Sequence, residues 1–380
     1  MSGDDARAQA PPDAVAVKAK ALALGFDLCG IARARALDRA AYDRWYANDW
    51  DARLPHMRSR IEERLDPRRL LPGAQSVIAL AASYGPSPDR SLPAAPGAGE
   101  RVEPSQSEGS QAQAQQSLPP PAESLRVARY AQGRDYHNAL LKRARKLAAW
   151  LRLAGAQVYA EVDAGAVAEK AWAMEAGLGW IGKNGLLIHE KFGSWLLLGA
   201  LVTDLKLAPD RPHGDRCGEC RACLPACPTD AIREGRLIDS NRCLAFHTIE
   251  SRAPIPPALA ARAGGRVFGC DACQEVCPWN RRAREGTLVE LRSRREQRAL
   301  ELESLLALTD AEAREKFLGT PLLRAGREGL VRAALAVCKR PLEGRSRQLA
   351  EGLRQDPSEA IRIEAARALG DASPEIHISK

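Results

Sequence analysis

The sequence has no hydrophobic run long enough to cross a membrane, and its first residues lack the pattern of a secretory signal. No stretch approaches about 18 uninterrupted apolar residues, the length typical of a membrane-spanning helix. Residues 1–13 are polar and acidic, with neither a basic start followed by an apolar segment nor a twin-arginine leader. We therefore expect a disordered N-terminus over 1–13 and a cytoplasmic protein that makes no use of a membrane.

The charge balance is basic, with a net charge of +8 and a pI of about 9.0. An arginine-rich genome explains this as well as a polyanionic partner does, so charge alone does not decide between them. The chain has 380 residues, of which 45% are hydrophobic, and this is enough for a buried core and two or three domains.

The order of apolar segments and helical patterns predicts three folded parts. Strands are expected over 28–31, 77–82, 157–162, 186–188 and 195–202, and helices over 15–23, 137–153 and 166–176. This alternation predicts an α/β domain over 14–207. A cysteine-rich domain over 208–285 follows, and then a helical segment over 286–380 in which 330–337 and 361–369 resemble helices of a repeat.

Residues 86–123 interrupt the first domain. The segment is rich in Pro, Ser, Gln, Ala and Gly and has no hydrophobic periodicity. Such a composition cannot bury enough apolar surface to fold. We predict a disordered insertion there.

Ten cysteines in a chain without export signals indicate metal rather than disulfides. The first motif is Cys217-x2-Cys220-x2-Cys223-x3-Cys227-Pro228, the run of bacterial ferredoxins, in which three cysteines bind one [4Fe–4S] cluster and the fourth binds the other. Cysteines three apart in turn-like backbone can reach three corners of one cube. A structural zinc site would need two separated pairs, which this run does not provide.

The second motif, Cys270-x2-Cys273-x3-Cys277-Pro278, lacks its first cysteine because Val267 occupies that position. The cross-over rule then assigns the ligands of the two clusters, with Cys243 completing the second. Cluster 1 is expected to bind to Cys217, Cys220, Cys223 and Cys277. Cluster 2 is expected to bind to Cys227, Cys243, Cys270 and Cys273. Cys29 and Cys338 remain, and we expect both to be small buried hydrophobic residues.

Two neighbouring clusters favour one-electron transfer to a site elsewhere in the chain, and the domain before them could contain that site. A purely structural pair of clusters is the alternative. Residues 177–184 contain both G-x-G-x-x-G and G-x4-G-K, yet they follow a helix, and Asn184 stands where a P-loop needs Ser or Thr. We therefore exclude ATP and NAD and expect a tight glycine loop.

Two polar positions in the first domain have competing interpretations. Asp163 lies between a strand and a helix, where it could be an N-cap or a general acid at the carboxyl end of the strand. Asp135-Tyr136-His137 begins like a cobalamin-ligand signature, but Leu140 replaces its glycine. We interpret His137 as an ordinary helix histidine.

The motifs together resemble those of the epoxyqueuosine reductase family. The segments that carry the resemblance are Tyr130, 133–137, Asp163 with Glu169, 176–184, 193–195, 241–243 and 269–280, together with the eight motif cysteines. The similarity covers roughly 14–369 apart from the insertion. The chain departs from the family's usual pattern at 164–166, Ala245 and His247, which affects details of a cofactor pocket but not the clusters.

The resemblance implies a fold and an activity. The fold would be an α+β/α/β multidomain arrangement: an N-terminal α/β cobalamin-binding domain, a ferredoxin-like domain with two [4Fe–4S] clusters and a C-terminal α-helical HEAT-like segment. The activity would be reduction of epoxyqueuosine to queuosine at the wobble position of tRNA. Electrons would pass from the clusters to cobalamin, and an unidentified donor of flavodoxin or ferredoxin type would supply them. We expect a monomer.

The resemblance also implies site residues. Asp163 matches the family's proton donor, and we expect burial to raise its pKa so that it is protonated at neutral pH. Arg64 matches a cobalamin contact, as do Asn184, Ser194 and Asp271. Asp163 would also lie against the cofactor.

Two other functions stay open at this point. One is a cobalamin and iron–sulfur reductase of a small molecule, similar to reductive dehalogenases. The other is an electron-transfer module fused to an inert domain. A basic second half of the chain favours tRNA, although the same residues could simply be solvated helix faces. These residues are Arg281, Arg282, Arg284, Arg292, Arg294, Arg295, Arg332, Lys339, Arg340, Arg362 and Arg367.

Overall fold

The structure is a computed structural model that describes residues 11–52, 54–85, 125–163 and 165–371. The disordered insertion expected over 86–123 lies outside the described residues, as do residues 1–10 of the disordered N-terminus expected over 1–13; the described Asp13 caps a helix instead. No helix within the described ranges is both long enough and apolar enough to span a membrane.

A four-stranded sheet forms the centre of the N-terminal domain. Its order is β1 (Leu28–Arg33), β2 (Ser76–Ser83), β7 (Leu196–Thr203) and β4 (Val158–Glu161), and every neighbouring pair is antiparallel. The expected strands are thus present. Their antiparallel direction differs from the parallel sheet that alternating strands and helices usually form, so this domain has an α+β rather than an α/β architecture.

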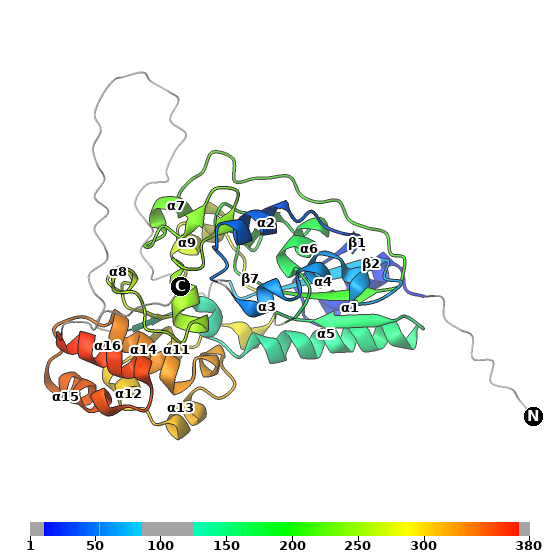
Figure 1. Cartoon of the computed structure of the whole chain (residues 1–380). Coiled ribbons are helices and arrows are strands. Elements are labelled where there is room, and N and C mark those ends of the chain that lie inside the picture. Colours follow the sequence, from blue (N-terminus) through cyan, green and yellow to red (C-terminus); the bar gives the residue numbers. More distant parts are fainter. Residues whose placement is uncertain (1–10, 53, 86–124, 164, 372–380) are drawn as a thin grey trace, which may run out of the picture.

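Helices cover both faces of this sheet. Side chains of β2 alternate between the faces, with Ile78 packing in one apolar cluster and Val77 in another. The first cluster includes α1 (Ala14–Ala23) and α5 (Tyr136–Leu153), and the second includes α6 (Glu169–Glu175). Figure 1 shows α5 along one side of the sheet and α6 on the other. The result is three layers, with the sheet in the middle.

One side-chain cap sets the start of α1, and left-handed backbone conformations set the limits of α6. Asp13 caps α1, because its Oδ1 accepts a hydrogen bond from the Ala16 N–H at 2.8 Å. Helix α6 begins at Glu169, three residues later than expected, since the chain leaves β4 through Asp163 in the left-handed region, at φ 63°. Gly177, at φ 73°, ends α6 as the sequence predicted.

The cysteine-rich part consists of short elements joined by turns. They are α7 (Cys223–Ala226), the antiparallel pair β8 (Ile232–Arg233) and β9 (Leu237–Ile238), the π-helical turn η3 (Phe246–Glu250), α8 (Pro257–Ala260), α9 (Ala272–Glu275) and α10 (Pro278–Arg281). Helices α7 and α9, which carry one cysteine motif each, pack against each other. The two motifs are therefore neighbours in space.

The C-terminal part is helical, and Figure 1 shows its helices gathered at one end of the molecule. Its helices are α11 (Arg295–Arg298), α12 (Leu302–Leu306), α13 (Asp310–Lys316), η5 (Pro321–Arg324), α14 (Gly326–Val337), α15 (Gly344–Gly352), η6 (Leu353–Gln355) and α16 (Glu359–Leu369). The helices expected over 330–337 and 361–369 are confirmed within α14 and α16, which pack together. The HEAT-like nature of this part stays a prediction.

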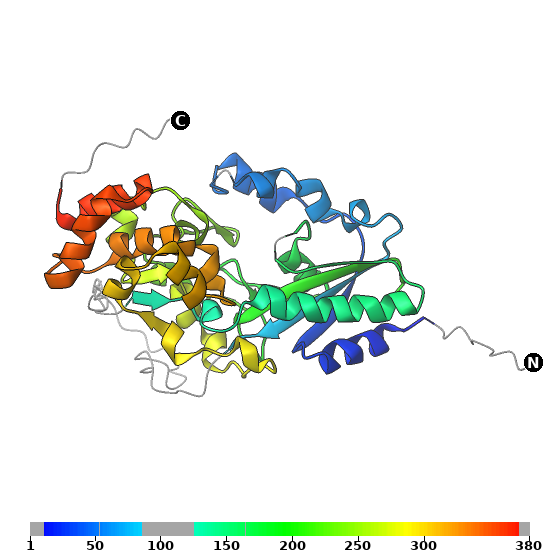
Figure 2. The same ribbon diagram turned by 90° about the horizontal axis from the view of Figure 1, so that it is seen from below.

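Short elements complete the chain. They are α2 (Ala40–Ala47), α3 (Pro55–Arg58), α4 (Ile61–Leu65), η1 (Pro67–Arg69), η2 (Arg129–Ala131), the antiparallel pair β5 (Trp180–Ile181) and β6 (Leu187–Ile188), and η4 (Val289–Leu291). The view in Figure 2 shows the α2–α4 segment on the opposite side of the sheet from α5.

One small sheet joins all three parts. Strand β3 (Leu125–Val127) pairs in parallel with β10 (Arg266–Phe268) and in antiparallel with β11 (Ala299–Leu300). Leu244 and Leu330, from the cysteine-rich and helical parts, share one apolar core with this sheet. A continuous core therefore spans the boundary that we expected at residue 285.

Candidate functional site

Four cysteines line a cavity of about 260 Å³ beside the β5–β6 hairpin. They are Cys217, Cys220, Cys223 and Cys277, the set expected for cluster 1. Trp180 and Ile188 of the hairpin pack against Cys277. The first three cysteines come from one turn-rich loop, whereas Cys277 comes from the second motif, as the cross-over rule requires.

Local hydrogen bonds hold this first loop in its turn conformation. The Cys220 N–H donates to the Cys217 carbonyl at 3.1 Å, and Asp215 Oδ1 accepts from the Cys217 N–H at 2.9 Å. Lys183, from the hairpin, donates from Nζ to the carbonyls of Gly218 and Cys220 at 2.6 and 2.8 Å. The side chain of Lys183 thus ties the backbone of the loop to the hairpin, and the three cysteines of the loop line the cavity.

A second cavity of about 270 Å³ lies on the other side of the same motifs. Its lining includes Cys227, Cys243, Cys270 and Cys273, the set expected for cluster 2. Cys243 belongs to neither motif, and the structure brings it to the other three although it lies 16 residues after Cys227 and 27 residues before Cys270.

The chemistry of both cavities suits a cluster with several iron ions. Burial raises the pKa of Cys270 to about 12 and that of Cys273 well above its ordinary value. These thiols therefore stay protonated at neutral pH unless cations in the cavity stabilise the thiolates. Four soft thiolate donors around one cavity match the ligand set of a [4Fe–4S] cluster. No three His, Cys, Asp or Glu side chains in the described residues converge as ligands of one metal ion.

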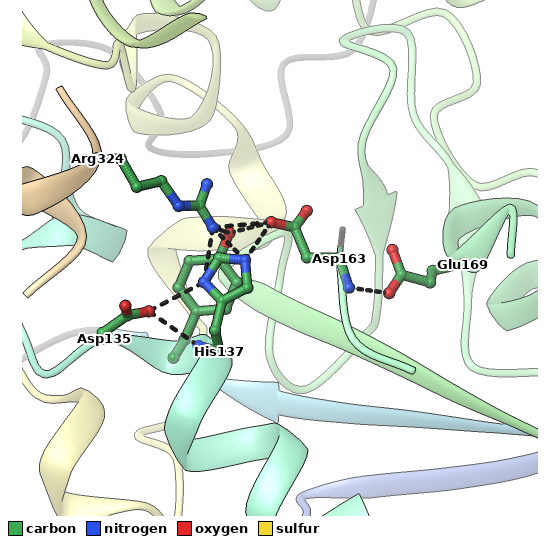
Figure 3. Close-up of polar contacts among 6 residues, drawn as sticks. Asp135, His137, Asp163, Glu169 and Arg324 are labelled. Atoms are coloured by element: carbon green, nitrogen blue, oxygen red, sulfur yellow. Dashed lines mark hydrogen bonds and ion pairs between the residues drawn. The ribbon is translucent and has the colours of Figure 1, made fainter. Parts of the chain in front are cut away.

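Asp163 lies at the carboxyl end of β4 in contact with three donors (Figure 3). Its Oδ2 accepts a hydrogen bond from the Tyr136 hydroxyl at 2.6 Å and lies 2.7 Å from His137 Nε2. Nδ1 of His137 lies 2.9 Å from Asp135 Oδ1. The Asp163 side chain keeps 43% of its surface exposed, so a substrate could reach it.

The third donor comes from the C-terminal part. Arg324, the last residue of η5, lies with Nη2 3.0 Å from Asp163 Oδ2 and 3.1 Å from the Tyr136 hydroxyl. It also contacts the His137 ring. Figure 3 shows Arg324 and His137 meeting on the same carboxylate oxygen of Asp163.

These donors reverse the expectation for Asp163. Burial acts to raise its pKa, but the hydrogen bonds from His137 and Tyr136 and the charge of Arg324 outweigh it, so the pKa is lowered. The expectation of a protonated Asp163 was therefore wrong for this arrangement. Burial acts to lower the pKa of His137, but its hydrogen bonds to Asp135 and Asp163 raise it to about 8. The proton of this cluster is on His137.

A second protonated group lies beside Asp163. Glu169, the first residue of α6, accepts a hydrogen bond from the Asp163 backbone N–H. Burial raises the pKa of Glu169 to about 8, and the nearby charge of Asp163 contributes to the rise. Asp163 is therefore not the N-cap of α6; that position is Ala168, which makes no capping side-chain bond.

A cavity of about 500 Å³ opens beside this cluster. Its lining includes Arg64, His137, Asp163, Glu169 and Arg324. Arg64 is buried, and its Nε has no hydrogen-bond partner within the described structure. An unpaired buried N–H is costly, and a ligand with oxygen acceptors would satisfy it. The amide-rich side chains of cobalamin meet that requirement, so Arg64 fits the expected cofactor, and Asp163 lines the same cavity.

The other three expected cobalamin contacts lie outside this cavity. Asn184 and Asp271 line the second cysteine cavity. Asp271 accepts hydrogen bonds from the Arg129 N–H at 2.6 Å and from Gln274 at 3.2 Å, and burial raises its pKa to about 6. Ser194 is buried, donating to Gln274 at 3.0 Å. These hydrogen bonds satisfy the polar groups of Asp271 and Ser194 without any contact to the Asp163 cavity.

Sequence reasoning missed Arg324 entirely and assigned His137 no role. The pairing of His137 with Asp163 had one available signal, the family resemblance of 133–137. Arg324 had none, because it is 161 residues from Asp163 in the chain.

Two expected basic contacts for a polyanion are also corrected. Arg332 is fully buried and donates to the carbonyls of His247, Ser251 and Ala253, and Arg367 is bonded to Glu364 and the Ile255 carbonyl. These side chains satisfy internal acceptors. By contrast, the described side chains of Arg281, Arg282, Arg284, Arg292, Arg294, Lys339 and Arg340 are exposed.

The two remaining cysteines lie apart from both cavities. Cys338 is buried in the core of the helical part, as expected. Cys29 is only partly buried, at the edge of the sheet core, and desolvation raises its pKa to about 12. Neither thiol is poised to react as a thiolate.

Comparison with known proteins places this geometry in a family. A family model for a 4Fe-4S double cluster binding domain matches residues 216–280, and one for epoxyqueuosine reductase QueG, DUF1730, matches residues 64–164. The epoxyqueuosine reductase of Gloeobacter violaceus is 40% identical over 333 residues, which are 85% of this chain and 95% of that protein.

Solved structures agree. An epoxyqueuosine reductase crystallised with an epoxyqueuosine-modified tRNA-Tyr stem loop is 27% identical, with a TM-score of 0.78 over 93% of this chain and 88% of that one. The Bacillus subtilis enzyme, solved with its catalytic aspartate loop swung out of its active site, is 26% identical, with a TM-score of 0.76 over the same shares. The chain is thus an oxidoreductase with a double-cluster domain, and it belongs to the epoxyqueuosine reductase family.

Proposed function

We propose that this protein reduces epoxyqueuosine to queuosine at the wobble position of tRNA, with Asp163 as the proton donor. Family membership supports the reaction, and the relative crystallised with an epoxyqueuosine-modified stem loop supports tRNA as the substrate. The observation that carries the site assignment is the convergence of Asp163, His137 and Arg324 on one cavity.

The reaction sets the requirements. Converting an epoxide to an alkene takes two electrons and two protons and releases the oxygen as water. Bound cobalamin would supply the two-electron reductant at the substrate, and two [4Fe–4S] clusters would supply it with single electrons. Arg64 would hold the cofactor through its unpaired Nε, and the two cysteine quartets would hold the clusters.

The chain itself supplies the proton that the opening epoxide takes up, and the second proton, which completes the released water, comes from solvent. His137, with a pKa of about 8, stores a proton on Nε2, which lies 2.7 Å from the Asp163 carboxylate. Asp163 takes that proton as the epoxide opens and delivers it to the developing alkoxide. Arg324 and Tyr136 hold the carboxylate in place by their hydrogen bonds to Oδ2. The pair therefore acts as one acid, with His137 as the store and Asp163 as the contact.

The remaining expectations complete the proposal. The protein is a cytoplasmic monomer, and a flavodoxin- or ferredoxin-type protein reduces its clusters. The exposed basic side chains of the second half bind tRNA phosphates. A small-molecule reductase would not need such a surface, and the family relation favours the tRNA substrate over that alternative.

The test uses anaerobically reconstituted protein with cobalamin, a strong reductant and tRNA that carries epoxyqueuosine. Mass spectrometry of the digested tRNA should show loss of one oxygen from the modified nucleoside. Asp163→Asn should lower the rate by about 10²–10⁴-fold, the usual contribution of a general acid. Asp38→Asn, at an exposed carboxylate, is the matched control.

Failure of the wild type to convert this tRNA, with iron and cobalamin bound, would overturn the substrate assignment. A fully active Asp163→Asn variant would overturn only the role of Asp163.

A further inference from the structure

The tip of the β5–β6 hairpin places one polar side chain between the two cysteine cavities. Gly182 and Gly185 shape the tip: the Gly182 N–H donates to the Leu186 carbonyl at 2.8 Å, and Gly185 adopts a φ of 71°. Asn184 lies between these glycines and is only 4% exposed. Among the described residues, Asn184 alone lines both cavities.

The tip is anchored, so the position of Asn184 is well defined. Lys183 binds two carbonyls of the first cysteine loop. On its other side, Gly185 accepts a hydrogen bond from Lys170 Nζ at 3.0 Å. A side chain between two such anchors has little freedom to turn away from the cavities.

The amide of Asn184 is satisfied at one end only. Its Oδ1 accepts a hydrogen bond from the Leu186 N–H at 3.4 Å, which sets the orientation of the group. Its Nδ2 is buried and has no hydrogen-bond partner in the described structure. Buried donors are rarely left unpaired, so this one indicates an acceptor that the protein itself does not provide.

The acceptors that belong in these cavities are sulfur atoms. Cluster sulfides and cysteine thiolates carry negative charge and accept N–H hydrogen bonds, and such bonds shift the reduction potential of a cluster. The bond is stronger in the reduced cluster, because that state is more negative. A donor at this place therefore favours reduction.

We propose that Asn184 donates a hydrogen bond from Nδ2 to sulfur at the wall between the two clusters and raises the reduction potential of the cluster that accepts it. This inference rests on the proposed function only in requiring that both cysteine quartets hold clusters. It replaces the expectation that Asn184 contacts cobalamin. The role is one of tuning electron transfer, since Asn184 supplies no ligand to iron.

Two substitutions of similar size separate the donor from the rest of the side chain. Asn184→Leu removes both polar ends, whereas Asn184→Asp keeps the acceptor for Leu186 and replaces the donor by an acceptor. Redox titrations followed by EPR would give the midpoint potential of each cluster in the reconstituted protein. Asn138→Asp, at an exposed position of α5, controls for the change in charge.

In Asn184→Leu, the equilibrium constant for reduction of at least one cluster should fall about tenfold. This corresponds to a decrease of about 59 mV in the midpoint potential of a one-electron couple. Asn184→Asp should lower it further, and Asn138→Asp should leave both potentials unchanged. Pulsed EPR in D2O should detect exchangeable deuterons coupled to a cluster, and this signal should be weaker in Asn184→Asp than in the wild type; the Ala231 N–H, which donates to Cys227 Sγ at 3.2 Å, contributes equally to both.

Unchanged potentials in both Asn184 variants, with full iron and sulfide content, would overturn the inference and leave the proposed function intact. Absence of clusters from reconstituted wild type would instead overturn the proposed function. If Asn184→Leu fails to fold, the potentials of Asn184→Asp and the difference in deuteron signal between this variant and the wild type decide the question.

Discussion

Nη2 of Arg324 lies 3.0 Å from Oδ2 of Asp163, although 161 residues separate the two in the chain. Arg324 belongs to the C-terminal helical part and Asp163 to the end of a strand in the N-terminal sheet. The helical part therefore contributes directly to the electrostatics of the candidate acid, in addition to any surface that it offers to tRNA.

Arg324→Gln should change both the rate and its pH dependence. The charge of Arg324 lowers the pKa of both Asp163 and His137, so its removal should raise both values. The decline in activity at high pH should therefore move to higher pH. Loss of a charged hydrogen bond should also lower the rate by about 10- to 100-fold.

The pH–rate profile of single-turnover conversion checks this, with Arg354→Gln, an exposed arginine paired with Asp371, as the control. A lower rate with an unshifted profile would reduce Arg324 to a structural role.

His137 should set the alkaline limit of activity. With a pKa of about 8, it is protonated below that pH and loses its proton above it. We expect the wild-type rate to fall as pH rises through about 8. His137→Gln should lack this limb and retain about one hundredth of the rate at neutral pH. His213→Gln serves as a control, and an alkaline limb that survives in His137→Gln would exclude His137 as the proton store.

Glu169 should make the protein less stable as pH rises. Its pKa in the folded state is about 8, above the ordinary value of 4.5, so between these values the folded state holds more protons than the unfolded state. The free energy of unfolding then decreases with increasing pH across that window. Glu169→Gln removes the ionisation and keeps an acceptor for the Asp163 N–H.

The difference in stability between wild type and Glu169→Gln should change by about 3 kcal/mol between pH 5 and pH 8, in favour of the variant at the higher pH. Chemical denaturation at several pH values measures it. Glu175→Gln, at the other end of α6, should show no such trend. Parallel stability curves would mean that Glu169 ionises normally.

Cys243→Ser should remove one cluster and spare the other. Cys243 lines the second cavity and has no contact with the first, so iron should fall from about eight to about four atoms per chain. Iron analysis and EPR of the reconstituted variant check this. Cys338→Ser should retain full iron. Loss of all iron from Cys243→Ser, in a folded protein, would contradict the separate ligand sets.

Exposed and buried arginines should differ in their effect on tRNA affinity. Arg281→Ala and Arg282→Ala change exposed side chains next to the second motif, and each should weaken binding and reduce its dependence on salt by about one phosphate contact. The buried Arg332 of the helical core should behave differently: Arg332→Met should destabilise the fold, since three carbonyls lose their donor. An unchanged salt dependence in both alanine variants would place the phosphate contacts elsewhere.

The cysteine quartets could be predicted from sequence because their geometry is local. Spacings of two and three residues, followed by Pro228 or Pro278, determine how the chain winds around a cavity. Cys243 alone could not be assigned from spacing. It was assigned because the two motifs supply seven of the eight ligands that two clusters need. The strands and helices of the N-terminal part were also predictable, since their apolar periodicity is regular.

The environment of Asp163 was not predictable, because it depends on tertiary contacts. Its lowered pKa comes from Tyr136, His137 and Arg324, and no spacing rule links these residues to it. Burial alone suggests the opposite direction. Arg332 was predicted to lie on the surface for a related reason, since charged side chains are usually exposed. Its burial depends on carbonyl acceptors in a turn that is distant in the sequence.

Strand β3 has a consequence for how the protein unfolds. Its three residues hydrogen-bond to β10 and β11, so the N-terminal, cysteine-rich and C-terminal parts meet in one small sheet above a shared core. None of the three can detach without exposing that core to water. The chain should therefore melt in a single cooperative transition, and its parts should not survive as separately expressed fragments.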